Sequence, residues 1–211
     1  MPVSVSLAGR KCLVVGGGTI ALRKIETLLE YDTEVTVVAL EAEPQIGYLA
    51  EKGVITLQKR EYKSPEAAAF GLVICATDDN AVNEQVAEDA RGAGVLVNVV
   101  DKPKLCDFIF PSLVRRDCLT IAVCTDGKAP FMSANLRAIL ENVFPKHWER
   151  IMSLAADYRK MVMERWPGDS VRKTECYQRF VSADWTAMLG EMNNADIRDE
   201  LGKMLEPDPK V

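Results

Sequence analysis

The sequence predicts an α/β protein that begins with a Rossmann-type parallel sheet, continues in a small α+β segment and ends in a helical region. Two observations predict this class. Short apolar runs alternate with helical patterns through the first half of the chain, as in β-α-β units. After residue 123 the alternation stops, and apolar residues recur at helical spacing. The expected strands cover residues 12–15, 34–40, 54–57, 71–76 and 95–100, with a helix over 44–52.

The turn after the first strand carries a dinucleotide-binding pattern. Gly16, Gly18 and Ala21 fit G-x-G-x-x-G/A between a strand and a helix, the context that this pattern requires. Gly16 allows a tight turn, and Gly18 lets a pyrophosphate approach a helix N-terminus, which favours anions. An ordinary tight turn is the alternative interpretation. We favour a dinucleotide site, to which Thr19 and Ile20 at the helix start also belong.

The second predicted strand ends beside an acidic residue. Leu40 and Glu41 lie roughly 20 positions beyond the glycines, where a Rossmann site binds the ribose 2′-hydroxyl. A solvated loop carboxylate is the alternative interpretation of Glu41. Between positions 34 and 55 the only cation is Lys52, so a 2′-phosphate has no obvious partner. We therefore expect NAD, rather than NADP, as the cofactor.

The fourth and fifth strands also end in polar residues. Thr77 follows the run 71–76, Asn83 lies one helical turn further on, and Asp101 follows the run 95–100. Carboxyl ends of parallel strands share one edge of the sheet, where doubly wound sheets bind ligands. Thr77 and Asn83 are expected to shape the cofactor loop. The aspartates after Thr77 are interpreted as caps of the next helix.

The pattern of the remaining chain changes twice. Residues 103–111 end the nucleotide-binding part, and 119–123 form one more expected strand. A helical stripe follows, made of Met132, Leu136, Ile139, Leu140 and Val143. Strand and stripe offer more apolar surface than a small appendage can bury, which predicts a homodimer. We expect an NAD-binding Rossmann domain over 1–112, a dimerisation and substrate segment over 113–145, and a C-terminal helical region over 146–211.

Composition excludes several classes of partner. The 211 residues are 48% hydrophobic, and 26 Lys and Arg face 31 Asp and Glu, which disfavours nucleic acid and anionic membranes. No apolar run is long enough for a membrane span, and no signal peptide is evident, so a cytoplasmic protein is expected.

None of the six cysteines forms a C-x-x-C pair, so we expect no metal site. Cys12 and Cys75 are interpreted as core residues.

Several stretches keep the order and spacing of a known family. They are Val14-Val15-Gly16-Gly17-Gly18 with Ala21 and Arg23-Lys24, Ala76-Thr77-Asp78-Asp79 with Asn83, Asn98-Val99-Val100-Asp101, Phe108-Ile109-Phe110-Pro111, Ala122-Val123, and Gly127 with Pro130. With them the chain resembles the precorrin-2 dehydrogenase / sirohydrochlorin ferrochelatase family, which includes the N-terminal part of siroheme synthases. The likeness is good from about residue 6 to 145. Relatives carry a serine- and glycine-rich turn where this chain has Thr125, Asp126 and Ala129.

The resemblance implies NAD-dependent oxidation of precorrin-2 to sirohydrochlorin in siroheme (porphyrin) biosynthesis, by a homodimer. Some relatives also insert ferrous iron into the tetrapyrrole. Asp101 matches the aspartate that is central to both activities, which implies a catalytic role. The chemistry suits a carboxylate, because a base must take a proton while a hydride leaves for the nicotinamide. A turn or cap aspartate is the alternative interpretation.

A tetrapyrrole with many carboxylates needs basic partners. The candidates for substrate binding are Arg115, Arg116, Lys128 and Arg137, each of which also fits an ordinary solvated charge. Two other functions stay open: a different small NAD-dependent oxidoreductase, or an NAD-sensing regulatory module that binds NAD without turning over a tetrapyrrole. The C-terminal segment has no basic recognition helix, which weighs against a repressor. No methyltransferase activity is expected of this chain.

Overall fold

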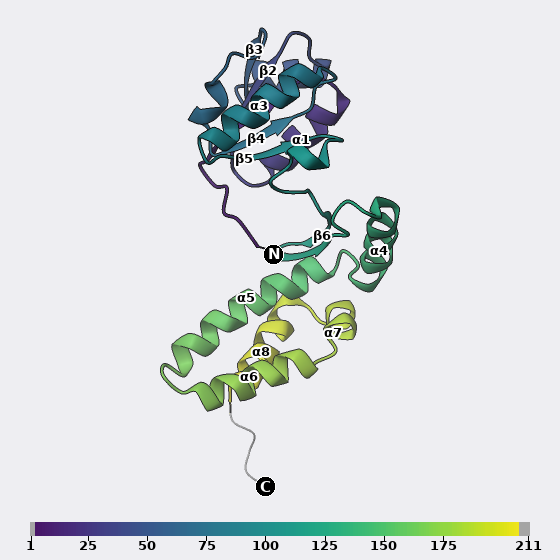
Figure 1. Cartoon of the computed structure of the whole chain (residues 1–211). Helices are drawn as coiled ribbons and strands as arrows, with labels where there is room; N and C mark the ends of the chain where they lie inside the picture. The colour runs from purple at the N-terminus through teal and green to yellow at the C-terminus, as the bar shows by residue number, and fades with distance from the viewer. Residues whose placement is uncertain (1–2, 207–211) are drawn as a thin grey trace. The chain divides into compact units, whose positions relative to one another are not determined.

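A computed structural model describes residues 3–206 of the chain (Figure 1). The chain divides into two compact units, Met1–Phe110 and Pro111–Val211. Within the described residues, no helix combines the length and apolar character needed to span a bilayer.

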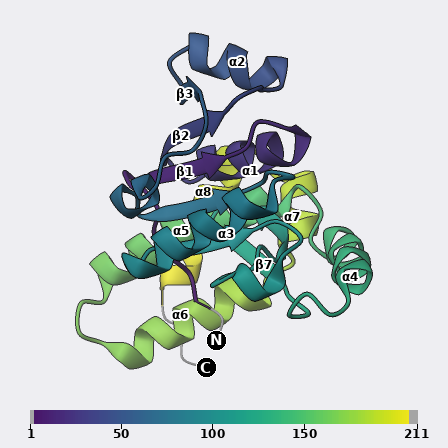
Figure 2. The ribbon, with the colours of Figure 1, turned by 45° about the horizontal axis from the view of Figure 1, so that its top comes forward.

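The first unit is built on a five-stranded parallel sheet, as the sequence predicts. Its strands are β1 (Lys11–Val15), β2 (Glu34–Ala39), β3 (Thr56–Lys59), β4 (Leu72–Cys75) and β5 (Leu96–Val99). They lie in the order β3-β2-β1-β4-β5. The connections contain the helices α1 (Thr19–Leu29), α2 (Pro44–Glu51) and α3 (Asn80–Gly92), and the short helices η1 (Glu66–Ala69) and η2 (Pro103–Leu105). Figure 2 shows β1, β2 and β3 in succession, with α2 beyond them.

Both faces of this sheet are buried, because alternate residues of each strand point to opposite sides. Cys12 and Val14 of β1 pack with α1 and α2 on one face. Leu13 and Val15 pack with η1 and α3 on the other face. A strand that is buried on both faces carries an unbroken apolar run rather than an alternating one, which is why these strands were readable in the sequence.

The third strand begins two residues later than predicted. Val54 and Ile55 are the apolar residues that suggested it, but they precede the ladder, in which Thr56 pairs with Thr36 and Lys59 with Ala39. Ile55 is instead buried in the core beneath α1 and α2. The apolar pattern therefore identified a residue of the core, Ile55, whereas the strand itself is defined by its main-chain pairing with β2.

In the part of the second unit that the structure describes, a hairpin is followed by five helices. Strands β6 (Ser112–Arg116) and β7 (Leu119–Val123) pair antiparallel, with Val114 opposite Ile121. The helices are α4 (Pro130–Val143), α5 (Trp148–Arg165), α6 (Ser170–Ser182), α7 (Trp185–Glu191) and α8 (Asn194–Leu205). β7 coincides with the expected strand, whereas β6 was not predicted. β6 carries two consecutive arginines, and its pairing with β7 makes it a strand.

The last four helices share one core. Tyr158 of α5 is 1% exposed, and its ring stacks on Phe180 of α6 with centroids 5.2 Å apart. Its hydroxyl donates to the carbonyl of Met204 at 2.8 Å, near the end of α8. In Figure 1 these helices lie together, which confirms the helical C-terminal region that the sequence predicts.

Candidate functional site

The carboxyl ends of β1 and β4 form the point where the strand order of the sheet reverses. The chain runs outward from β1 through β2 and β3, then returns to add β4 on the opposite side of β1. Doubly wound sheets bind ligands at such a point, because the loops leave in opposite directions and open a crevice. The glycine turn follows β1, and the loop that begins with Ala76 and Thr77 follows β4.

Gly16 sits directly against the loop after β4. Its φ is +112°, and a Cβ there would lie 2.2 Å from the carbonyl oxygen of Ala76. Its N–H donates to the carbonyl of Val38 at 2.9 Å, which holds the turn against β2 as well. Only glycine fits this conformation and this space.

The loop after β2 is attached to the same turn. A Cβ on Gly17 would lie 2.2 Å from the carbonyl oxygen of Glu41, so the two backbones touch. The N–H of Glu43 donates to the carbonyl of Gly17 at 2.8 Å. The Thr19 hydroxyl donates to a carboxylate oxygen of Glu43 at 2.9 Å. Glu43 was not among the predicted site residues, because this contact joins positions 24 apart that no local pattern relates.

Gly18 faces open space. A Cβ at this position would have no protein atom within 4 Å, and the residue has an extended backbone with φ of −80°. It is the N-cap of α1, which has no side-chain cap and no acidic residue in its first turn. The N–H groups of that turn and the helix dipole therefore suit an anion, and a pyrophosphate fits this helix start. Ile20 of α1 and Leu40, which follows β2, are 45% and 66% exposed, so apolar surface is also available to a ligand.

Thr77 and Asn83 form a closed network behind the second loop. Asn83 is 2% exposed, and its carbonyl oxygen accepts from the Thr77 hydroxyl at 2.9 Å and from the Cys75 thiol at 2.9 Å. Its amide donates to the carbonyl of Thr77 at 3.0 Å. Asp79 caps α3 by accepting from the N–H groups of Ala81 and Val82, so its interpretation as a cap is right. The amide of Asn83 thus holds the loop from inside.

Asp101 occupies the third position of a tight turn after β5. The N–H of Lys102 donates to the carbonyl of Val99 at 3.2 Å and closes the turn. Asp101 is exposed, with φ of +57°. A non-glycine residue is uncommon in this left-handed region, although aspartate tolerates it better than most. Asp32, Asp117 and Asp126 share the conformation, so the backbone alone does not single out Asp101.

The predicted substrate-binding residues of the second unit differ in their exposure and in their interactions with other groups of the chain. Arg116 donates from Nε to the carbonyl of Phe144 at 2.7 Å, which caps the end of α4. Arg137 pairs with Glu141 one turn along α4. Arg115 is half-buried on β6, and Lys128 is exposed in the turn before α4. The altered turn is ordered by Thr125, whose hydroxyl accepts from the N–H of Ala129 at 3.2 Å.

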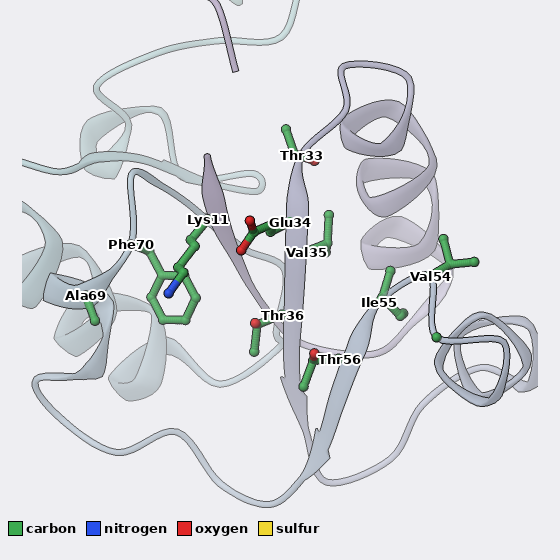
Figure 3. A pocket seen from close by; sticks show the side chains of 11 residues that line it. Lys11, Thr33, Glu34, Val35, Thr36, Val54, Ile55, Thr56, Ala69 and Phe70 are labelled. Atoms are coloured by element: carbon green, nitrogen blue, oxygen red, sulfur yellow. The ribbon is translucent and has the colours of Figure 1, made fainter. Parts of the chain in front are cut away.

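A hollow of about 530 Å³ lies at the end of the sheet opposite to the glycine turn (Figure 3). It opens at the amino ends of the strands, and Lys11, Glu34 and Phe70 are among the residues that line it. None of the predicted site residues lines it. Parallel sheets bind ligands at their carboxyl ends, so the candidate site stays at the glycine turn.

The thiols of the sheet are buried. Burial raises the pKa of Cys12 from 9.0 to about 11 and that of Cys75 to about 12, which keeps both protonated and confirms them as core residues. The described residues contain no group of three or more His, Cys, Asp or Glu side chains placed to hold a metal ion.

Known proteins are similar to this chain in sequence and in fold. The family model described as "Putative NAD(P)-binding" matches residues 3–112. The siroheme synthase of Nitrosococcus oceani is 42% identical over 173 residues, 82% of this chain and 37% of the relative. That of Thioalkalivibrio sulfidiphilus is 35% identical over 205 residues, 97% of this chain and 42% of the relative. This chain therefore spans about two fifths of the length of these relatives.

A solved structure covers nearly the whole chain. The structure of SirC, a precorrin-2 dehydrogenase, superposes with a TM-score of 0.77 over 97% of this chain and 98% of that chain. The two sequences are 24% identical, so this likeness shows a shared fold.

Proposed function

The chain belongs to the NAD(P)-binding family, and from this premise we propose that it oxidises precorrin-2 to sirohydrochlorin with NAD, in the synthesis of siroheme. One observation carries the proposal: the open start of α1 at Gly18 and the turn of Asp101 both follow strands of the same sheet at its ligand-binding edge. The siroheme synthases that align with most of this chain support the choice of substrate.

The residues of this chain divide the work between binding and proton transfer. The free N–H groups at the start of α1 hold the pyrophosphate, and Ile20 and Leu40 give the adenosine an apolar surface. NAD held there would supply the hydride acceptor. The substrate loses a hydride and a proton, and the exposed carboxylate of Asp101 accepts the proton. Asn83 holds the loop of Thr77 and has no direct part in the chemistry.

Two carboxylates favour NAD over NADP. Glu41 is exposed two residues after the end of β2, and Glu43 accepts from the hydroxyl of Thr19 at the start of α1. A 2′-phosphate placed there would meet the negative charge of these two side chains. We expect NAD to bind at least several-fold more tightly than NADP in a fluorescence titration. Equal or tighter binding of NADP would contradict this preference.

The substrate carboxylates are assigned to the basic residues of the second unit. Lys128 is the most accessible of them, and Arg115 and Arg137 are half-buried. Arg116 already caps α4, so it contributes least. Insertion of ferrous iron, as a second substrate, stays a prediction, and so does the cytoplasmic location.

We also propose that the protein is a homodimer formed through its hairpin and α4. Phe131, Ile139 and Val143 of α4 are 72%, 50% and 56% exposed, so one side of this helix is apolar and is not covered by the described residues. β6 and β7 form a two-stranded sheet, and such a hairpin gains stability when further structure packs on it. A second copy of the same surface would cover both features.

The decisive experiment supplies precorrin-2 and NAD and follows the absorbance of NADH and of sirohydrochlorin. We expect both products from the wild-type chain. Asp101→Ala should bind NAD normally and lose turnover by roughly 100-fold or more, the scale of a lost acid–base group. Asp101→Asn, which keeps the shape but accepts no proton, should be equally impaired.

The other outcomes identify the alternatives. NAD binding without turnover would indicate a regulatory module, and turnover of another substrate would indicate a different oxidoreductase. Full activity of Asp101→Asn with loss in Asp101→Ala would reduce Asp101 to positioning the substrate. Near-normal turnover in both variants would move the search for the base to residues 77–83.

A further inference from the structure

β5 is the outer strand of the sheet, and the returning chain closes its free edge. The N–H of Asp107 donates to the carbonyl of Val97 at 2.8 Å, and the N–H of Val97 donates to the Asp107 carboxylate at 3.2 Å. The amide of Asn98 donates to the carbonyl of Phe108 at 2.8 Å. Residues 106–108 therefore bond to an edge that no sixth strand covers.

At the end of β5 a single side chain takes over this task. The N–H of Val99 donates to the sulfur of Cys106 at 3.3 Å, and the thiol donates to the carbonyl of Val99 at 3.1 Å. The amide of Asn98 approaches the same sulfur at 3.6 Å. Val99 is 1% exposed, so without this thiol its N–H would lose its partner away from bulk water, whereas its carbonyl would keep the bond from the N–H of Lys102.

The same thiol reaches the other end of the Asp101 turn. The carbonyl of Lys102 lies 3.4 Å from the sulfur, within the reach of the thiol proton. A thiol has one proton, so it donates to Val99 or to Lys102 at any moment. Val99 and Lys102 are the first and last residues of the turn, so Cys106 contacts both ends of the segment that carries Asp101.

This support matters because Asp101 has a left-handed backbone conformation, which is unfavourable for most residues other than glycine. Asp101 has φ of +57°, a region in which L-residues persist only when their surroundings hold them. The carboxylate itself is exposed, so its placement comes from the backbone beneath it. A turn that loosened by a fraction of an ångström would move that carboxylate away from its working position.

We infer that Cys106 is a positioning residue for Asp101, and that its thiol sets the placement of the carboxylate by bonding to both ends of the turn. The inference rests on the proposed function, in which Asp101 is the base. It assigns no contact with substrate or cofactor to Cys106 itself.

The test compares Cys106→Ala, Cys106→Ser and Cys12→Ala in the full chain. Cys12 is a buried thiol of β1, whereas Cys106 is half-buried after η2; the Cys12 sulfur lies 3.8 Å from the carbonyl of Arg10, at the amino end of β1 and away from the Asp101 turn, so its loss controls for general destabilisation. Cys106→Ala should lower kcat for precorrin-2 by about 10- to 100-fold, with NAD affinity within about twofold of wild type. Serine keeps a donor and an acceptor on a shorter bond and should give an intermediate kcat. Cys12→Ala should keep the wild-type kcat.

A double variant separates positioning from a merely structural role. If Cys106 acts through Asp101, adding Cys106→Ala to Asp101→Ala should lower kcat no further, because the effects of residues that act as a unit do not add. The inference is overturned if the two losses multiply, or if Cys106→Ala stays within twofold of wild type. Should Cys106→Ala fail to fold, Cys106→Ser decides, and a wild-type kcat in that variant overturns it.

Different results would reject the proposed function and the inference about Cys106. Absence of precorrin-2 turnover in the wild type, or normal turnover in Asp101→Ala, would remove the proposed function, and the inference with it. Normal turnover in the Cys106 variants alongside an impaired Asp101→Ala would remove the inference alone.

Discussion

Gly16, Gly17 and Gly18 stand side by side, yet each is glycine for a different reason. A side chain on Gly16 would strike the loop after β4, and one on Gly17 would strike the loop after β2. Gly18 has a backbone that any residue adopts, and a Cβ built there would meet no atom of a described residue beyond its chain neighbours within 4 Å. The first two glycines are therefore required by the packing of the fold, whereas the third leaves space for a ligand.

This difference yields a paired prediction. Gly18→Val should leave the free energy of unfolding near that of wild type and weaken NAD binding at least about tenfold, because the new side chain occupies the path of the pyrophosphate. Gly16→Ala should instead lower the free energy of unfolding by roughly 1–3 kcal/mol, through strain at φ of +112° and the contact with Ala76. Denaturant unfolding and a cofactor titration on both variants check this. Unchanged NAD affinity in Gly18→Val would mean that the phosphates bind elsewhere.

Asp101 and Asp32 share a backbone conformation but lie at opposite edges of the sheet. Asp32 precedes β2 with φ of +53°, and Asp101 follows β5 with φ of +57°. Glycine relieves a left-handed position, so either residue changed to glycine should keep or raise the free energy of unfolding, by up to about 1 kcal/mol. Asp101→Gly should lose turnover, whereas Asp32→Gly should keep it. Loss of stability in Asp101→Gly alone would show that its carboxylate supports the fold.

At the scale of the element, β1 and β4 show what burial on both faces does to a side chain. Cys12 and Cys75 are fully buried in these neighbouring strands, and burial raises the pKa of each thiol. A group whose pKa is higher in the folded state stabilises that state fully below its unfolded pKa, and the stabilisation is lost as the pH rises.

The two thiols therefore predict a loss of stability in alkali. Above pH 9 the unfolded chain releases these protons while the folded chain keeps them to about pH 11 for Cys12 and about pH 12 for Cys75. Each thiol should lower the free energy of unfolding by about 1.4 kcal/mol for every pH unit in that window. Urea unfolding between pH 8 and about pH 10 measures the slope, and Cys12→Ala with Cys75→Ala should reduce it; above that pH, Tyr62 and Tyr158, whose pKa values burial also raises, add to the loss. An equal slope in that double variant would assign the effect to other groups.

At the scale of the whole molecule, the second unit has two kinds of helical surface. The last four helices bury their aromatic residues against one another. α4 packs on the hairpin through one side and leaves Phe131, Ile139 and Val143 uncovered. An apolar surface of this kind on one helix fits an interface between two copies better than a surface meant for water.

Charged residues on that surface should separate the dimer. Ile139→Glu combined with Leu136→Glu places two carboxylates on α4 and should convert the dimer to a monomer in sedimentation velocity at micromolar concentration, since a buried unpaired charge is costly. Val181→Glu is the matched control, because Val181 is an 81% exposed apolar residue of α6 in the same unit. A monomeric wild type, or a dimer that tolerates both glutamates, would contradict the proposed interface.

The sequence by itself determined which strands build the sheet, and it predicts at which end of the sheet the site lies. Runs such as Cys12–Val15 and Leu72–Cys75 are unbroken because both faces of their strands are buried, and that pattern is local. Gly18, Thr77 and Asp101 were expected at one edge because parallel strands end on the same side, which needs no knowledge of distance.

Only the tertiary structure decided the contacts that join segments far apart in the chain. The Thr19–Glu43 bond and the pairing of β6 with β7 depend on which backbones meet, and periodicity carries no information about that. The sulfur of Cys106 is the clearest case, since an isolated cysteine in a polar stretch gives no sign that it closes the edge of β5. Its partners are main-chain groups, which every residue has, so only their positions in space could identify it.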